Sequence, residues 1–199
     1  MIIVVHYGAG NIRSVTKAIE NVGARVAVSA DPRELTKADK VVLPGVGAFG
    51  KAVEALRSRR LIGPLKEAIH QGKPFLGICL GFQLLFSISE ESPGVKGLSI
   101  LNGKVKRFPK DSNVPHLGWN RVDQSGSSPL WKNIPDGTYF YFAHSYFVKA
   151  GDVDTITGTT VYGFRFVSAL TNERVFGVQF HPEKSQKWGL KLLNNFIAL

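Results

Sequence analysis

Apolar and polar positions in the first half of the chain alternate between short buried runs and segments of helical period. The apolar runs, each bounded by glycine or polar residues, predict strands at 2–6, 25–29, 40–45 and 74–78. The helical patterns predict helices at about 11–22, from Asp31 onward, at 49–60, at 64–71 and at 80–89. Strict alternation of strand and helix predicts a parallel sheet with helices on both faces.

Three glycine-containing loops follow strands of this predicted sheet. Their sequences are YGAGN (7–11), PGVGAF (44–49) and ICLG (78–81). Ligands of open α/β sheets bind at the carboxyl ends of the strands, so these three loops are expected to meet there. Asn11, in the first loop, is a typical N-cap residue for the helix that follows it.

The second half of the chain has a different pattern, in which strand-like runs crowd together with short connections. The runs lie at 97–101, 103–108, 118–122, 139–148, 155–162, 166–170 and 174–180. They predict antiparallel strands added to the parallel sheet, or a smaller second sheet. A helix at about 186–198 ends the chain. The expected fold class is α/β: a mostly parallel central sheet flanked by helices, with antiparallel strands in the C-terminal half.

Composition fits one ordinary globular domain over residues 1–199, with 44% hydrophobic and 20% charged residues. The apolar run at the N-terminus stops at His6 and has no basic leader, so it predicts a strand rather than a signal peptide. No apolar run approaches the roughly 20 residues that span a bilayer, so no membrane association is expected. The single cysteine excludes an internal disulfide and favours a reducing cytoplasm.

The net charge of +10 suggests attraction to anions or docking on an acidic partner. Basic residues are scattered, and their densest cluster is Arg57, Arg59 and Arg60 on a predicted helix. The sequence contains no motif typical of a nucleic-acid-binding fold, so a nucleic-acid partner is not expected. The histidines lack metal-ligand spacing and one cysteine cannot form a thiolate zinc site, so no metal is expected.

Cys79 stands at the end of an apolar strand, directly before Leu80 and Gly81 at the start of a predicted helix. A sharp strand-to-helix turn of this kind is typical of a nucleophile elbow. A helix N-terminus would lower the pKa of a thiol, and its free N–H groups could hold an oxyanion. Position alone is equally compatible with a small buried core residue, because free cysteines are often buried.

The segment VFGVQFHPE (175–183) strengthens the catalytic interpretation. It reads as a strand that ends in His181, Pro182 and Glu183. In an extended segment, residues two apart point the same way, so Glu183 could orient one nitrogen of His181 while the other faces a nucleophile. Alone, the tripeptide is equally compatible with a cap or a turn.

The motifs together resemble those of a known family. GICLGFQ (77–83) with HPE about a hundred residues later is similar to class I, triad-type, glutamine amidotransferase domains. YGAGNIRSV, LPGVGAF, PHLGWN, YFAHSY and QFHPEKS, in this order, resemble the glutaminase subunits of imidazole glycerol phosphate synthase. The resemblance covers nearly the whole chain and implies a flavodoxin-like fold that hydrolyses L-glutamine to glutamate and ammonia, with no cofactor.

The resemblance also implies roles for individual residues. Cys79 would attack the glutamine side-chain amide to form a glutamyl thioester, His181 would relay protons and Glu183 would orient His181. The oxyanion hole would be formed by N–H groups of Leu80 and of a rearranged loop containing Val46 and Gly47. Positions matching those that hold glutamine are Gln83, Ser145 and Tyr146, with Glu91 a candidate for the α-amino group.

The partner implied by the resemblance is a (β/α)8-barrel cyclase subunit, joined in a heterodimer. Ammonia would pass through a channel to this subunit, which makes imidazole glycerol phosphate and aminoimidazole carboxamide ribotide. Positions matching partner-facing or hinge positions are Asn11, Trp119, Tyr141 and Lys184, each of which is also compatible with ordinary surface packing.

Two alternatives stay open on the sequence. A glutaminase serving another pathway, such as anthranilate or pyridoxal phosphate synthesis, is disfavoured by the PGVGAF and PHLGWN motifs. A non-catalytic interaction or stress-response protein on the same fold would make Cys79 a redox sensor. The HPE tripeptide in the expected place disfavours that second alternative.

Overall fold

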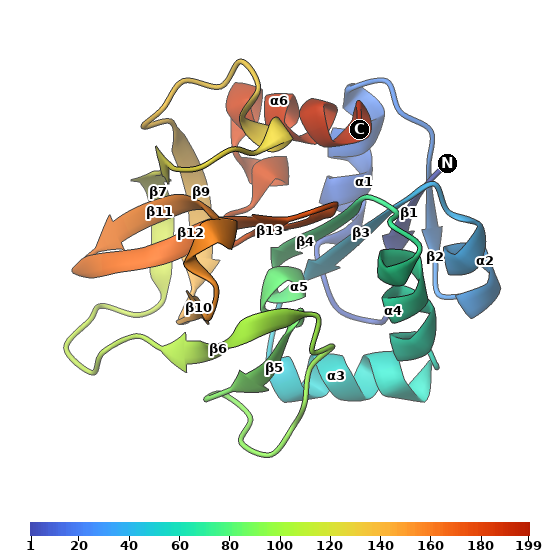
Figure 1. Ribbon diagram of the computed structural model, residues 1–199, viewed down its shortest axis with the longest axis horizontal. Helices are drawn as coiled ribbons and strands as arrows, with labels where there is room; N and C mark the ends of the chain where they lie inside the picture. Colours follow the sequence, from blue (N-terminus) through green and yellow to red (C-terminus); the bar gives the residue numbers. More distant parts are fainter.

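The computed structural model describes residues 1–199 and contains a large mixed sheet with helices on both faces (Figure 1). The main strand order is β2-β1-β3-β4-β13-β12-β10-β6-β5, and β11 and β8 extend the sheet beside β12. The strands in chain order are β1 (Ile2–Val5), β2 (Val26–Ser29), β3 (Lys40–Gly45), β4 (Phe75–Cys79), β5 (Phe86–Ser89), β6 (Leu101–Arg107), β8 (Asp123–Gln124), β10 (Tyr146–Ala150), β11 (Ile156–Tyr162), β12 (Phe164–Asn172) and β13 (Val175–Val178).

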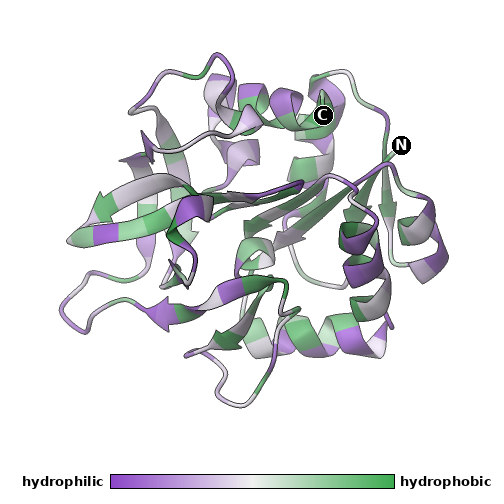
Figure 2. Ribbon diagram, viewed as in Figure 1, coloured by the Kyte–Doolittle hydropathy of each residue, from purple (hydrophilic) through white to green (hydrophobic).

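The central part of the sheet is parallel, from β2 through β1, β3 and β4 to β13. Every residue of β1 and of β4 is buried, because helices cover both faces. Successive residues of a strand therefore enter two different cores: Ile3 and Val5 pack in one, and Ile2 and Val4 in the other. Figure 2 shows these central strands as the most continuously hydrophobic part of the ribbon.

Five helices cover the two faces. Residues of α2 (Pro32–Lys37), α3 (Phe49–Ser58) and α4 (Ile62–His70) pack in the first core, and residues of α1 (Ile12–Asn21) and α6 (Gln186–Ile197) pack in the second. Figure 1 shows these two groups on opposite sides of the sheet. None of the helices is both long enough and apolar enough to cross a lipid bilayer.

The C-terminal half adds antiparallel strands, as the sequence predicted. β12 pairs antiparallel with β13, and β10 joins β12 to β6. A separate two-stranded sheet is formed by β7 (His116–Arg121) and β9 (Tyr139–His144), which are antiparallel. The predicted run at 139–148 is therefore two strands in different sheets, β9 and β10, with a break at Ser145. The expected fold class, a mostly parallel central sheet with flanking helices and added antiparallel strands, is confirmed.

The predicted helix at 80–89 is wrong. Helix α5 (Leu80–Gln83) has a single turn, and the chain then enters β5. The carbonyl groups of Leu84 and Leu85 accept hydrogen bonds from the amides of Leu98 and Ile100, so they cannot continue a helical ladder. Tertiary pairing with a later segment overrides the local helical pattern, and the predicted strand at 97–101 is reduced to the start of β6.

Candidate active site

The loops at the carboxyl ends of the central strands come together, as the strand and helix pattern predicted. Gly45 at the end of β3 is in register with Cys79 at the end of β4. The Tyr7 hydroxyl, from the loop after β1, donates a hydrogen bond of 3.0 Å to the carbonyl of Pro44. A Cβ atom on Gly45 would lie 2.8 Å from the Gly81 amide nitrogen, so these loops touch through backbone.

Cys79 has a left-handed backbone conformation, with φ 54° and ψ −109°. A non-glycine residue holds such angles only where its surroundings enforce them, and such strain is typical of functional turns. Gly81 contributes to this tight turn, because a Cβ atom there would lie 1.8 Å from the carbonyl oxygen of Leu43. The α5 segment after Cys79 has only one turn, so the helix dipole expected from a long helix is correspondingly reduced.

His181 and Glu183 are brought to Cys79 by β13, which runs parallel to β4. Nδ1 of His181 lies 2.8 Å from Oε1 of Glu183, and both side chains are buried. The contact does not arise from an extended segment, as the spacing had suggested, because Pro182–Lys184 form a 3-10 turn. The amide of His181 donates to the Tyr141 carbonyl, which fixes the segment against β9.

The charge state of His181 depends on its two neighbours. Burial lowers its pKa, but the charge and hydrogen bond of Cys79, together with Glu183, raise the pKa by more, to about 10. The imidazolium form of His181 is therefore favoured at neutral pH. Burial also raises the pKa of the Tyr7 hydroxyl, and Cys79 raises it further, so Tyr7 remains a neutral hydrogen-bond donor.

Gln179 is a neighbour of the cysteine that sequence reasoning missed. Its buried Nε2 lies 3.7 Å from the Cys79 sulfur, and its Oε1 accepts a hydrogen bond of 3.0 Å from Nε2 of Gln83. That second contact fixes the orientation of the amide, with the NH₂ group toward the sulfur. The signal was present in the sequence, because Gln179 lies two residues before His181 in the same strand-end segment.

A cavity of about 250 Å³ opens beside the cysteine. Its walls contain all three predicted oxyanion-hole residues and all four predicted glutamine-binding residues. The lining residues are Val46, Gly47, Cys79, Leu80, Gln83, Glu91, Pro115, Ala143, His144, Ser145 and Tyr146. The volume suits a ligand smaller than a typical drug molecule, and polar groups line it on several sides.

The predicted oxyanion-hole residues differ in exposure. Leu80 is buried and follows the cysteine directly, whereas the Val46 side chain is 43% exposed. Gly47 has φ 97°, a backbone conformation that favours glycine. The loop after β3 is thus exposed to solvent at Val46 and Gly47, directly after the buried end of the strand.

Two predicted glutamine-binding residues already have protein partners. Nε2 of Gln83 donates to the Tyr146 carbonyl at 3.0 Å. Oε2 of Glu91 accepts a hydrogen bond of 2.7 Å from the Phe49 amide, which caps the start of α3. Glu91 therefore has a structural contact beside its position in the cavity wall.

Three of the four predicted partner-facing residues lie together. Trp119 and Tyr141 are opposite each other in the β7–β9 pair, with ring centroids 6.2 Å apart. Nζ of Lys184 lies 5.4 Å from the Tyr141 ring centroid. Asn11, the fourth, occupies the N-cap position of α1, and its side chain makes no capping hydrogen bond. No group of three or more histidine, cysteine or acidic side chains is arranged to hold a metal ion.

Comparison with known proteins identifies the family of this chain. The family model described as "Glutamine amidotransferase class-I" matches residues 3–199. The chain is 48% identical to the imidazole glycerol phosphate synthase subunit HisH of Moorella thermoacetica, covering 98% of this chain and 93% of that protein. It is 47% identical to the HisH subunit of Chlorobium chlorochromatii, with both chains fully covered.

The fold also matches solved structures. The structure described as PurLQS from Thermotoga maritima aligns with a TM-score of 0.80 at 20% identity, covering 99% of this chain and 97% of that one. At that identity the match supports the fold alone, whereas the family model and the HisH relatives cover the sequence nearly end to end. This chain therefore belongs to the class-I glutamine amidotransferase family, together with the HisH subunits of imidazole glycerol phosphate synthase.

Proposed function

We propose that this protein is the glutaminase subunit of an imidazole glycerol phosphate synthase. It hydrolyses L-glutamine to glutamate and ammonia, and the ammonia serves a cyclase subunit in histidine biosynthesis. The observation that carries the proposal is that Cys79, in the wall of the small cavity, is hydrogen-bonded to His181, whose Nδ1 lies 2.8 Å from Oε1 of Glu183. The 48% identity to a HisH subunit across 98% of the chain supports the pathway. The single free cysteine suits a reducing cytoplasm.

The reaction begins at the sulfur. The Cys79 thiolate attacks the side-chain amide carbon of glutamine, and the carbonyl oxygen becomes an oxyanion in a tetrahedral intermediate. The His181 imidazolium gives its proton to the amide nitrogen, the carbon–nitrogen bond breaks, and ammonia leaves a glutamyl thioester. Neutral His181 then removes a proton from water, whose oxygen attacks the thioester and releases glutamate, restoring the thiolate and imidazolium.

Other groups around the sulfur orient His181, hold the oxyanion and bind glutamine. Glu183 accepts the Nδ1–H of His181 and keeps Nε2 directed at the reacting atoms. The N–H of Leu80 and an N–H of the loop at Val46 and Gly47 hold the oxyanion, and this loop rearranges to present its donor. Gln83, Ser145 and Tyr146 hold glutamine in the cavity, and Glu91 faces its α-amino group.

The partner binds at the β7–β9 sheet. Leu117, Trp119 and Tyr139 expose 64%, 46% and 57% of their surface there, an apolar area of the kind that marks protein interfaces. The inner edge of this sheet reaches the site, because the Ala143 carbonyl lies 3.9 Å from the Cys79 sulfur. A (β/α)8-barrel cyclase docked on this surface receives ammonia through a channel. Enclosure keeps ammonia from water, where it would be protonated and lose its nucleophilicity.

The proposal is tested by reacting the protein with a glutamine-analogue electrophile, 6-diazo-5-oxo-L-norleucine, at neutral pH. We expect one label per chain, located on Cys79 by peptide mass spectrometry, and protection by L-glutamine. In parallel, ammonia release from glutamine is measured with and without the cyclase subunit. Failure to label Cys79, together with no ammonia release in the complex, would refute the glutaminase function.

A further inference from the structure

A pair of buried histidines connects strand β7 to the wall of the glutamine cavity. His116 and His144 are cross-strand partners in the β7–β9 pair, and Nδ1 of His116 lies 3.1 Å from Nε2 of His144. Only 2% and 6% of their surfaces are exposed. His144 lines the cavity directly, although sequence reasoning assigned neither histidine a role.

The donor and the acceptor in each hydrogen bond of the pair follow from the contact of His144 with the Tyr146 carbonyl. Nδ1 of His144 lies 2.7 Å from the carbonyl oxygen of Tyr146, and because a carbonyl only accepts, this nitrogen carries the proton. Nε2 of neutral His144 is then an acceptor, so His116 must donate to it from Nδ1. Nε2 of His116 is in turn an acceptor, and Nδ2 of Asn120 lies 3.1 Å away to donate to it.

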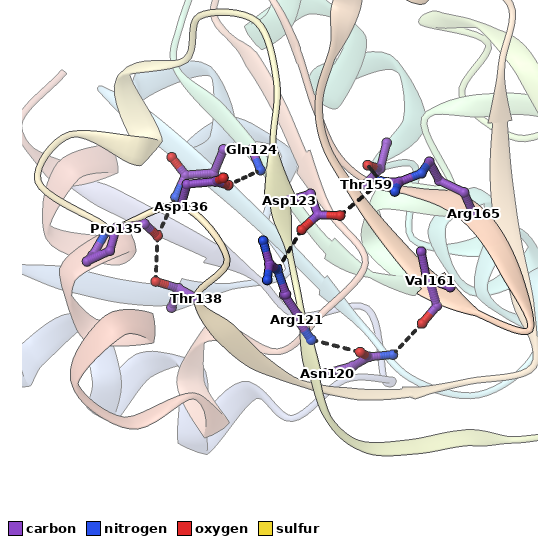
Figure 3. Close-up of polar contacts among 10 residues, drawn as sticks. All are labelled: Asn120, Arg121, Asp123, Gln124, Pro135, Asp136, Thr138, Thr159, Val161 and Arg165. Carbon is purple, nitrogen blue, oxygen red and sulfur yellow. Dashed lines mark hydrogen bonds and ion pairs between the residues drawn. The ribbon is translucent and has the colours of Figure 1, made fainter.

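The side-chain amide of Asn120 has the orientation that this series of hydrogen bonds requires. Its Nδ2 also donates to the Val161 carbonyl at 3.0 Å, and its Oδ1 accepts from the Arg121 amide at 2.8 Å (Figure 3). Two independent backbone contacts therefore fix which end of the amide faces His116. Asn120 follows Trp119 directly, so the chain of hydrogen bonds begins on the strand that carries the exposed tryptophan.

The other end of this series of hydrogen bonds reaches the nucleophile. The Tyr146 carbonyl that accepts from His144 also accepts from Nε2 of Gln83. The same Gln83 nitrogen donates to Gln179, whose amide nitrogen lies 3.7 Å from the Cys79 sulfur. The Tyr146 carbonyl is thus the shared acceptor between the two histidines and the amides beside the sulfur.

The packing around the two rings keeps them neutral and fixed. Burial lowers the pKa of His116 to about 4. Burial, together with the charges of His116 and His181, lowers the pKa of His144 to about 3, although the hydrogen bond to the Tyr146 carbonyl raises it. The His116 ring is stacked between Tyr162 and Phe142, at centroid distances of 4.1 and 4.7 Å.

We propose that His116 and His144 are positioning residues of the glutamine pocket, which hold the Tyr146 carbonyl and through it the Gln83 amide in the orientation that receives glutamine. Both act as neutral Nδ1–H donors in one direction, from β7 toward the cavity. The inference rests on the proposed glutaminase function. A purely structural role would require burial of the rings and would not require this tautomer or this direction of donation.

Kinetics of the complex with the cyclase subunit test the positioning role. His116→Phe keeps the stacked ring but leaves Nε2 of His144 without its donor, and we expect KM for glutamine to rise about tenfold with a smaller change in kcat. His116→Asn, whose Nδ2 can take the place of the imidazole Nδ1, should restore most of the affinity. Tyr162→Phe is the matched control: it keeps the other stacked ring, loses one hydrogen bond to the Asn113 carbonyl, and should leave KM unchanged.

Nitrogen-15 NMR of the protein labelled at histidine tests the hydrogen-bond chain without any activity. Both rings should show a proton on Nδ1 and none on Nε2 from pH 8 to pH 5, with signals assigned by their loss in His116→Asn and His144→Asn. A proton on Nε2 of His144, or a folded His116→Phe protein whose KM lies within twofold of wild type, would overturn the inference. A wild-type complex that does not hydrolyse glutamine would instead refute the proposed function, while the tautomers would still be measured.

Discussion

Nδ1 of His181 and Oε1 of Glu183 are 2.8 Å apart although the two side chains expose only 3% and 1% of their surface. Burying an imidazole and a carboxylate is costly unless they are paired, so each depends on the other. The short 3-10 turn between them makes this pairing local, whereas the contact of His181 with Cys79 depends on the parallel pairing of β13 with β4. The 3-10 turn thus orients the His181 base, whereas the pairing of β13 with β4 places this base beside the Cys79 nucleophile.

Glu183→Gln should separate orientation from binding. The amide cannot stabilise imidazolium and can present its NH₂ group to Nδ1, which would favour the wrong tautomer of His181. We expect kcat for glutamine hydrolysis to fall by about 10²–10⁴-fold with little change in KM, by analogy with triad carboxylates. Steady-state ammonia release in the complex measures both parameters, and a kcat within threefold of wild type would contradict the orienting role.

Replacement of Cys79 by alanine should remove the glutaminase reaction without disturbing the subunit. We expect glutamine-dependent turnover to fall by at least about 10³-fold, because no other thiol exists in the chain. The thermal midpoint should not fall, since alanine leaves the strand end intact. As a control, synthesis supported by added ammonium salt should continue at the wild-type rate in the complex with Cys79→Ala. Retained glutamine turnover would refute the assignment of the nucleophile.

The buried histidine pair predicts acid sensitivity of the fold. The pKa values of His116 and His144 are lowered to about 4 and about 3, below the value of about 6.5 in an unfolded chain. Their contribution to stability is therefore present above pH 6.5 and is lost as the pH falls toward 4. The free energy of unfolding should drop by at most about 1.4 kcal/mol per histidine per pH unit. His181 opposes this decline near pH 6.5, because its raised pKa keeps it protonated in the folded protein while in the unfolded chain it gains its proton only as the pH falls through about 6.5; at lower pH it is protonated in both states and adds no slope.

Urea unfolding at pH 7, 6 and 5 measures this dependence. His116→Phe should show a shallower decline than wild type over the same range, because one of the two titrating rings is gone. A wild-type free energy of unfolding that is the same at pH 7 and pH 5 would show that the pair does not remain neutral in the folded protein.

Gly81→Ala should damage both stability and activity. The added Cβ would lie 1.8 Å from the Leu43 carbonyl oxygen, which is backbone and not the end of a flexible side chain that could move away. We expect a loss of about 3 kcal/mol in the free energy of unfolding, at the upper end of overpacking effects, and misplacement of Cys79. Gly63→Ala in α4 is the matched control: its Cβ meets nothing within 4 Å, and alanine should be neutral or slightly stabilising. Equal stability of the two variants would refute the close approach.

Trp119→Ala should weaken binding of the cyclase subunit without affecting the fold. Large aromatic side chains at the centre of an interface commonly contribute about 2 kcal/mol or more, which corresponds to roughly a thirtyfold rise in Kd. Val153→Ala is the control, because Val153 is 72% exposed but lies in the turn before β11, outside the β7–β9 sheet. Isothermal titration calorimetry measures both, and similar Kd values for both variants would place the docking surface elsewhere.

Much of the fold could be predicted from the sequence because its signals are local. Short apolar runs bounded by glycine defined the parallel strands, and Asp31 with Pro32 defined the start of α2, where the Asp31 side chain accepts from the Arg33 amide. The helix predicted at 80–89 failed because nothing within that segment shows that Leu84 and Leu85 pair with residues beyond 97. Long-range pairing of this kind is not encoded in periodicity.

The same contrast between local signals and long-range pairing holds for the candidate site. The residue types and motif order predicted which side chains line the cavity, but not their contacts with one another. Glu91 bonds the start of α3, and Gln179 faces the sulfur, through pairings that join segments 42 and 100 residues apart. The donor role of His144 required the position of the Tyr146 carbonyl, two residues away across a strand break.

The register between β3 and β4 restricts where this chain can change length. Because Gly45 is opposite Cys79, inserting or deleting one residue within either strand would carry the following loop past the sulfur and turn every core side chain of that strand to the opposite face. Insertions beyond Gly47, or at the amino ends of the strands, would leave the alignment untouched. Changes in the length of this part of the chain are therefore confined to segments that lie outside the two paired strands.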